Sequence, residues 1–109
     1  MADLLGTFEQ SVLLSIFGLG ADAYGRAILN RVQETLKRDV AAGAVYATLE
    51  RLEARGLVSS RLAEGTAIRG GRARRYYALA AEGQRALGDT RRALTAMWNN
   101  VDLPTRGRS

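Results

Sequence analysis

The chain has 109 residues, which suits a single domain with a modest core, because a domain of this size buries only about two thirds of its unfolded surface. All but one of its 16 basic side chains are arginine, and with 11 acidic ones they give a net charge of +5, which suits a polyanionic partner. The chain has no cysteine or histidine, so most zinc sites, disulfides and nucleophile–base pairs are excluded, and we expect no metal, no cofactor and no enzyme.

The hydropathy of the chain does not indicate a membrane protein. Its longest apolar stretch, residues 11–21, is about half as long as the ~20 residues that a membrane-spanning helix needs. Asp3 stands where a secretory signal would carry basic residues. We therefore expect a cytoplasmic protein.

A first helix is predicted to begin with a capping box at Thr7, whose hydroxyl would accept from the Gln10 amide while the Gln10 side chain reaches back. Leu13, Leu14 and Phe17 make its apolar stripe wider than one helix face. The helix is therefore either deeply buried or shared with a second subunit, and we favour the second interpretation. The regularly spaced members of the stripe are Phe8, Val12, Ile16 and Leu19.

A second helix is predicted after Gly18 and Gly20, with Asp22 placed to cap it. Apolar side chains then recur at every fourth position, which is the spacing of one buried helix face. They are Tyr24, Ile28, Val32 and Leu36.

A third helix is predicted over residues 42–55, and Val45, Leu49 and Leu52 mark its buried face. Gly56 is expected to take the left-handed position just beyond the helix. Leu57 would then pack on Leu52, as in a Schellman motif.

Beyond Leu57 the apolar period changes to two, which predicts a strand over residues 58–63. A turn over residues 65–71 and a returning strand over 74–79 complete a hairpin, with Tyr77 and Leu79 facing inward. A last helix is predicted over residues 81–99.

The order of three helices, a hairpin and a helix predicts a mainly α (α+β) fold, a winged helix-turn-helix with a C-terminal dimerisation helix. We expect a winged-helix DNA-binding domain over residues 1–79, the dimerisation helix over 80–99 and a disordered tail over 100–109.

The exposed face of the third helix is the predicted major-groove surface. Gly43, Ala44 and Ala47 lack bulk, so the helix can lie close to DNA, unless these residues merely favour helix formation. Tyr46 is a candidate phosphate ligand through its hydroxyl, with a partly buried core tyrosine as the alternative. Arg51 would either reach phosphate or guanine or be held in an ion pair on its own helix.

The hairpin carries a cluster of four arginines, Arg69, Arg72, Arg74 and Arg75, with no acid between Glu64 and Glu82. Two glycines let the tip bend close to a backbone, and guanidinium groups match phosphate oxygens bidentately. Strand alternation places Arg72 and Arg74 on one face and Arg75 on the other. All four are predicted DNA contacts, with Arg72 and Arg74 first, although a charge cluster can also be no more than a solvated face.

These segments resemble PadR-type transcriptional regulators, in particular the short branch with a single C-terminal helix. The resemblance covers about residues 5–98. It rests on Leu13–Leu19, Asp22-Ala23-Tyr24-Gly25, Gly43–Glu53 with Gly56-Leu57-Val58, and Gly71–Leu79 followed by Gly83. By position, Tyr46 resembles the recognition-helix tyrosine of the family, and Arg72 and Arg74 its basic wing residues.

The resemblance implies a homodimeric bacterial repressor of double-stranded DNA in which the first and last helices form the dimer interface. Two-fold symmetry would match a palindromic operator with half-sites about one helical turn apart. The interface residues implied are Phe8, Val12, Leu13, Ile16, Leu87, Leu94, Met97 and Trp98.

Some short-branch members bind flat aromatic drugs against a tryptophan between the paired last helices, and Trp98 lies in a similar place. Trp98 is thus a candidate contact for a planar hydrophobic effector, or else packs only in the interface. The chain departs from the family at two helix starts, where Ala41 or Ala42 replaces the common serine and Ala80 the usual threonine. Each change removes an N-cap worth about 1 kcal/mol.

A second reading of the same fold is a winged-helix protein-interaction module, or a heterodimer partner without its own operator. Strongly salt-dependent binding of duplex DNA would separate the two readings.

Overall fold

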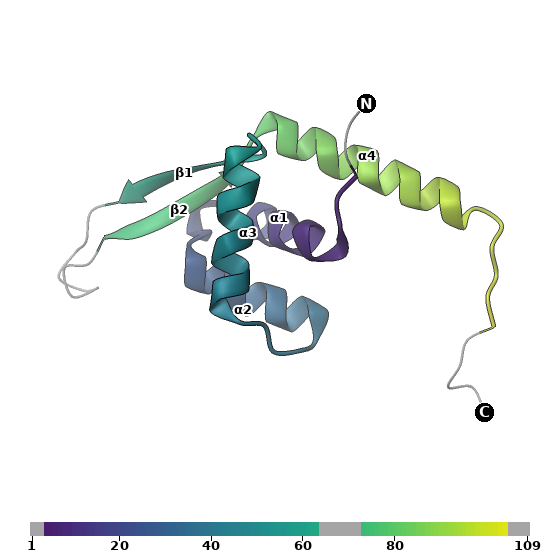
Figure 1. Ribbon diagram of the computed structural model, residues 1–109, viewed down its shortest axis with the longest axis horizontal. Coiled ribbons are helices and arrows are strands. Elements are labelled where there is room, and N and C mark those ends of the chain that lie inside the picture. Colours follow the sequence, from purple (N-terminus) through teal and green to yellow (C-terminus); the bar gives the residue numbers. More distant parts are fainter. Residues whose placement is uncertain (1–3, 64–72, 105–109) are drawn as a thin grey trace.

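A computed structural model describes residues 4–63 and 73–104, and statements below refer to these residues. Three helices form a compact group, an antiparallel pair of strands extends from it on one side, and the last helix extends on the other (Figure 1). The elements in chain order are α1 (Thr7–Leu19), the short 3-10 helix η1 (Gly20–Asp22), α2 (Gly25–Leu36), α3 (Ala42–Ala54), β1 (Val58–Ala63), β2 (Arg74–Leu79) and α4 (Ala81–Trp98). This confirms the predicted winged helix-turn-helix. No described helix is long and apolar enough to cross a bilayer.

The core lies around α1, which contacts α2, α3, β2 and α4. Val12, Leu13 and Ile16 of this helix are almost completely buried within the single chain. The prediction that they lie in a dimer interface is corrected, because neighbours on several sides of α1 cover the wide apolar stripe. Of the stripe, only Leu14 and Phe17 are clearly exposed.

The start of α1 differs from the predicted capping box. The N-cap is Gly6, whose N–H donates to Glu9 Oε1 at 3.0 Å, while the Gln10 side chain donates to the Leu5 carbonyl at 3.1 Å. Thr7 is therefore the first helical residue rather than the cap. The carboxylate of Glu9 and the Gln10 amide satisfy backbone groups at this helix start in place of the Thr7 hydroxyl.

The second helix also begins later than predicted. Asp22 lies in η1, and the N-cap of α2 is Tyr24, in extended conformation and without a side-chain cap hydrogen bond. The reason is a long-range contact: the Tyr77 N–H donates to the Ala23 carbonyl at 2.8 Å, and Tyr24 forms an isolated bridge with Tyr76. Ala23 and Tyr24 are thus held beside β2, with Tyr24 in extended conformation, which keeps them out of the helix.

The end of α3 is as predicted. Gly56 has a φ of 78°, its N–H donates to the Glu53 carbonyl, and the Leu57 N–H donates to the Leu52 carbonyl, both at 2.9 Å. These two bonds are those of a Schellman motif. The chain then enters β1, whose pairing with β2 matches Ser60 with Tyr77.

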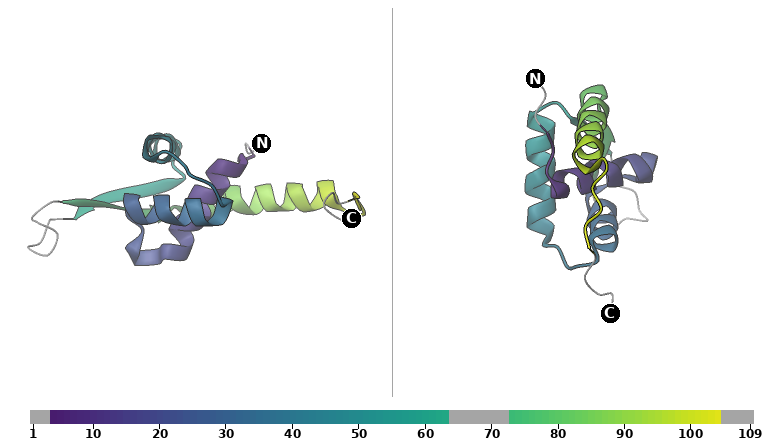
Figure 2. Two further views of the ribbon diagram at one scale, coloured as in Figure 1. Left: turned by 90° about the horizontal axis from the view of Figure 1, so that it is seen from below. Right: turned by 90° about the vertical axis from the view of Figure 1, so that its right-hand side faces the viewer.

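The last helix leaves the body of the protein after its first turns (Figure 2). The Ala80 N–H donates to the Leu57 carbonyl at 3.0 Å, and Gly83 packs against the same group. The Leu5 N–H donates to Thr90 Oγ1 at 3.0 Å, which ties the N-terminal segment to the middle of α4. Beyond this point the side chains of Leu94, Met97 and Trp98 are exposed.

Candidate nucleic-acid interface

The outward face of α3 carries every recognition-helix residue that is predicted to contact DNA. All five are exposed: Gly43, Ala44, Tyr46, Ala47 and Arg51. The opposite face, formed by Val45, Leu49 and Leu52, is fully buried and fixes the rotation of the helix. A Cβ on Gly43 would meet nothing within 4 Å, so packing inside the protein does not explain its small size.

Arg51 and Tyr46 on this helix each have a defined neighbour. The Arg51 guanidinium donates to Thr48 Oγ1 at 3.0 Å and forms no ion pair with a described acid, so the ion-pair alternative is not observed. The Tyr46 side chain is 44% exposed, so part of it is buried and part is open to solvent. Its ring lies over Gly25, where an added Cβ would be 2.6 Å from Cε1 and 3.0 Å from the hydroxyl oxygen. Gly25 therefore makes room for the tyrosine.

A basic pocket of about 290 Å³ lies where Tyr46 meets the start of α2 and strand β2. Its lining includes Arg26, Arg74 and Arg75 and no acidic side chain. The first turn of α2 has no side-chain cap and no acidic residue. It contains Arg26 instead, although the helix dipole disfavours a cation at the N-terminal end of a helix. A bound anion would relieve that repulsion and use the free backbone N–H groups.

Sequence reasoning missed Arg26 as a site residue, because its sequence position suggests only a solvated helix surface. Its role depends on β2 returning beside α2, which local sequence does not show. One feature of the sequence could have indicated Arg26 as a site residue. Tyr24 and Gly25 give a helix start without a capping side chain, and the cationic Arg26 follows directly.

The wing, meaning β1, β2 and the residues between them, carries Arg74 and Arg75 of β2 on opposite faces, as predicted. The Arg74 guanidinium lies 3.8 Å from the centroid of the Tyr24 ring. The Arg75 guanidinium donates to Ser60 Oγ at 2.9 Å, and this hydroxyl donates to Glu53 Oε2 on α3 at 2.8 Å. Arg75 is thereby linked to the recognition helix. The predicted contacts Arg69 and Arg72 lie outside the described residues.

Tyr77 anchors the same strand to the helices. Its side chain packs against the core, and this burial raises the pKa of the phenol, although the positive charge of Arg75 opposes the shift. The phenol is thus neutral near pH 7 and acts as a structural support of the wing.

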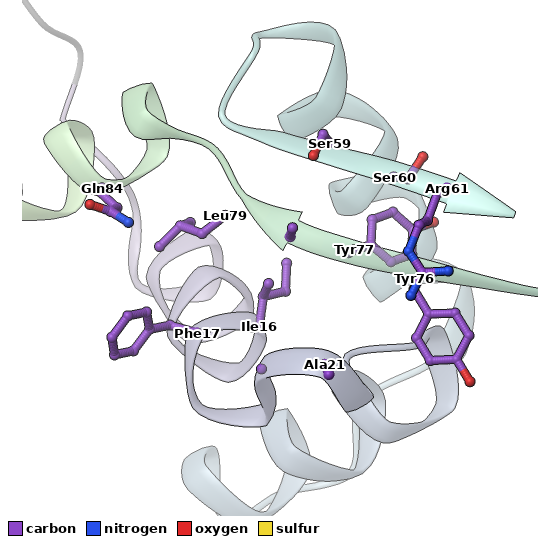
Figure 3. A pocket seen from close by; sticks show the side chains of 12 residues that line it. Ile16, Phe17, Ala21, Ser59, Ser60, Arg61, Tyr76, Tyr77, Leu79 and Gln84 are labelled. Carbon is purple, nitrogen blue, oxygen red and sulfur yellow. The ribbon is translucent and has the colours of Figure 1, made fainter. Parts of the chain in front are cut away.

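A second pocket, of about 530 Å³, lies between the end of α1 and the wing (Figure 3). Ile16, Phe17 and Leu79 give it apolar walls, and Arg61 is the only charged side chain in its lining. It is distinct from the basic pocket, whose lining shares only Tyr77 with it.

The dimer residues implied by the sequence fall into three groups, of which the first, Val12, Leu13 and Ile16, is buried within the single chain. Leu94, Met97 and Trp98 are exposed, whereas Phe8 and Leu87 are half-buried against the core. A groove of about 420 Å³ runs between α1 and α4 along Leu14, Leu87 and Leu94. Apolar surface is thus available on α4 and beside it.

Comparisons with known proteins agree with this geometry. The family model described as "Transcriptional regulator PadR-like family" matches residues 13–89. A PadR-like transcription factor from Bacteroides fragilis is 26% identical, with a TM-score of 0.71 over 88% of this chain and 87% of that one. RosR of Halobacterium salinarum is 27% identical, with a TM-score of 0.64 over 91% and 81% of the two chains.

A PadR-family regulator from Clostridium difficile is 25% identical, with a TM-score of 0.67 over 86% of this chain and 96% of that chain. None of the curated proteins compared with the chain matches it. Members of the matched family regulate transcription and are not enzymes, which confirms the expectation of a regulator. With well over half of its residues matched by the family model, the chain belongs to the PadR-like family of transcriptional regulators.

Proposed function

We propose that the protein is a homodimeric repressor that binds a palindromic operator in double-stranded DNA. The observation that carries the proposal is the basic pocket beside the exposed small-residue face of α3. A helix that lies in a DNA groove needs a second contact with the DNA backbone to fix its register. The basic pocket lies next to Tyr46 of α3 and would provide that contact. The acid-free lining favours a phosphate there.

In this proposal α3 enters the major groove with Gly43, Ala44 and Ala47 against the base edges. Their small side chains favour contacts with thymine methyl groups over bidentate hydrogen bonds. Arg26, the Tyr46 hydroxyl and Arg74 would bind backbone phosphate. Phosphate contacts set orientation and affinity, so sequence preference would depend on the α3 face and on DNA shape.

The homodimer is proposed from the apolar surface on α4. Leu94, Met97 and Trp98 are exposed on one chain, and the groove along Leu14 and Leu87 would receive the same helix of a second copy. Soluble monomers rarely leave large apolar patches open to water. Two-fold symmetry would then place two α3 helices on successive turns of one DNA face.

A planar hydrophobic effector at Trp98 is also proposed. The indole is 56% exposed in the single chain, so it is accessible to a ring that stacks on it as well as to a partner helix. Quenching of its fluorescence by planar compounds would be concentration-dependent and saturable. Equal quenching by a non-planar compound of the same polarity would argue against stacking.

DNA binding is tested by anisotropy of a labelled duplex of mixed sequence, titrated at several salt concentrations. Arg26→Ala, Arg72→Ala and Arg74→Ala should each weaken binding and reduce the log–log salt slope by about 0.9 for each phosphate that is no longer neutralised. Arg85→Ala is the matched control, because it removes the same charge from a side chain that is paired with Glu82 on α4. Unchanged affinity and slope in all three variants, or an equally weakened control, would contradict the interface.

Dimerisation is tested by sedimentation velocity of the whole chain. Met97→Asp with Leu94→Asp should convert dimer to monomer without loss of helical signal, because both side chains are exposed in the single chain. Leu62→Asp is the control, since Leu62 is also exposed but lies on β1. A wild-type monomer that requires another regulator for DNA binding would favour the heterodimer reading.

A further inference from the structure

Two arginines and two tyrosines form a continuous stack on the face of the wing opposite to Arg75 and Tyr77. The Arg74 guanidinium lies 3.8 Å from the Tyr24 centroid, and Tyr24 meets Tyr76 edge-to-face with ring centroids 5.8 Å apart. Arg61 lies 5.0 Å from the Tyr76 centroid, across the ring as Figure 3 shows. The four side chains come from β2, from β1 and from the start of α2.

Main-chain contacts hold the segments that carry the stack next to each other. Tyr24 is paired with Tyr76 by a main-chain bridge, and the neighbouring Tyr77 N–H donates to Ala23. Tyr24 is also the N-cap of α2, directly before Gly25 and Arg26 of the basic pocket. Its ring therefore stands at the place where the wing, α2 and that pocket meet.

We propose that Tyr24 is a positioning residue for DNA binding, which orients the Arg74 guanidinium toward a backbone phosphate in the basic pocket. The proposal rests on the proposed function, because it needs DNA as the ligand. Cation–π stacking uses the face of the guanidinium and leaves the N–H donors along its edge free for phosphate oxygens. Arg74 lines the pocket, so that edge is available there.

The physical benefit is pre-organisation. An unsupported arginine on a strand must lose side-chain entropy when it binds phosphate, whereas one already stacked on a ring has lost part of it in the free protein. Tyr76 meets the Tyr24 ring edge-to-face and is itself covered by Arg61, so the Tyr24 ring has a packed neighbour besides Arg74. Arg75 has no such support from a ring among the described residues and instead donates to Ser60.

The test compares Tyr24→Leu and Tyr24→Phe in the anisotropy assay with the labelled mixed-sequence duplex. Tyr24→Phe keeps the ring and should bind within about twofold of wild type. Tyr24→Leu removes the ring and should bind about fivefold more weakly, which corresponds to about 1 kcal/mol for one cation–π contact. Binding by Tyr24→Leu as tight as by the wild type would overturn the proposal.

A double-mutant cycle separates positioning from a general structural role. In an Arg74→Ala background, Tyr24→Leu should weaken binding no further, because the group that it orients is gone. In an Arg75→Ala background, the matched control on the other face of β2, the fivefold weakening should persist. Equal weakening in both backgrounds would show that Tyr24 acts through the fold and would overturn the proposal.

Arg74→Lys gives a readout that does not depend on altering Tyr24. Lysine keeps the charge but lacks the planar group that can stack and bind phosphate together, so binding should again weaken about fivefold. Wild-type affinity in Arg74→Lys would refute the stacking requirement. If Arg74→Ala weakens binding but the Tyr24 variants do not, only this inference fails, whereas a wild-type chain that does not bind DNA refutes the proposed function itself.

Discussion

Gly83→Ala tests the joint between the DNA-binding body and α4. An added Cβ would lie 2.2 Å from the Leu57 carbonyl oxygen and 2.8 Å from Leu79 Cδ1, so the helix must move away from the base of the wing. Overpacking of this kind destabilises a protein by about 1–3 kcal/mol. This cost exceeds the gain in helix propensity when alanine replaces glycine, which is under ~1 kcal/mol. We expect Tm to fall by about 5–10 °C, at about 4–8 °C per kcal/mol for a domain of this size.

Gly88→Ala is the matched control in the same helix. Its Cβ would meet only the flexible end of Arg92, at 3.5 Å, so the better helix propensity should raise Tm by about 4–8 °C. Thermal unfolding followed by circular dichroism, at one chain concentration for all variants, measures both shifts. If Gly83→Ala is as stabilising as Gly88→Ala, α4 does not pack closely on Leu57 and the reasoning is refuted.

Three further predictions concern the interface and its support. Tyr46→Phe would remove the proposed hydrogen bond to phosphate and should weaken DNA binding about tenfold with an unchanged salt slope, because no cationic group is lost. Gly25→Ala should displace the Tyr46 ring, which its Cβ would approach to 2.6 Å, and so weaken binding with little change in Tm; a normal affinity would contradict the contact. Burial raises the pKa of Tyr77 above 10.0, so the unfolded chain ionises first and stability should fall as the pH rises through that value. In urea titrations at increasing pH, Tyr77→Phe should remove this part of the pH dependence.

The elements that are predictable from sequence are those specified by near neighbours. The end of α3 needs only Leu52, Gly56 and Leu57, and these form the expected Schellman bonds. The alternation in β2 places Tyr77 inward and Arg74 and Arg75 on opposite faces, because side chains in a strand alternate regardless of distant contacts. The exposed face of α3 follows from the same local reasoning about helical period.

Apart from the N-cap of α1, where Gly6 and Glu9 replace Thr7 and Gln10 through local contacts, the failures depend on partners that are distant in sequence. Tyr24 fits the helical stripe of α2, yet pairing with Tyr76 draws it into extended conformation. Val12 and Leu13 belong to a stripe too wide for one face, but its width does not show whether other helices of the same chain or a second subunit covers it. Arg26 and the Tyr24–Arg74 stack become site features only when β2 is placed beside the start of α2.

Leu57 connects α3 with α4. Its N–H closes the end of α3, its carbonyl accepts from Ala80 at the start of α4, and Gly83 packs on the same carbonyl. The recognition helix and the proposed dimerisation helix are thus joined through one residue rather than through a flexible linker. In a dimer held by α4, this joint would set the separation of the two α3 helices and hence the half-site spacing. Gly83→Ala should therefore shift the preferred spacing of selected operators as well as lower Tm.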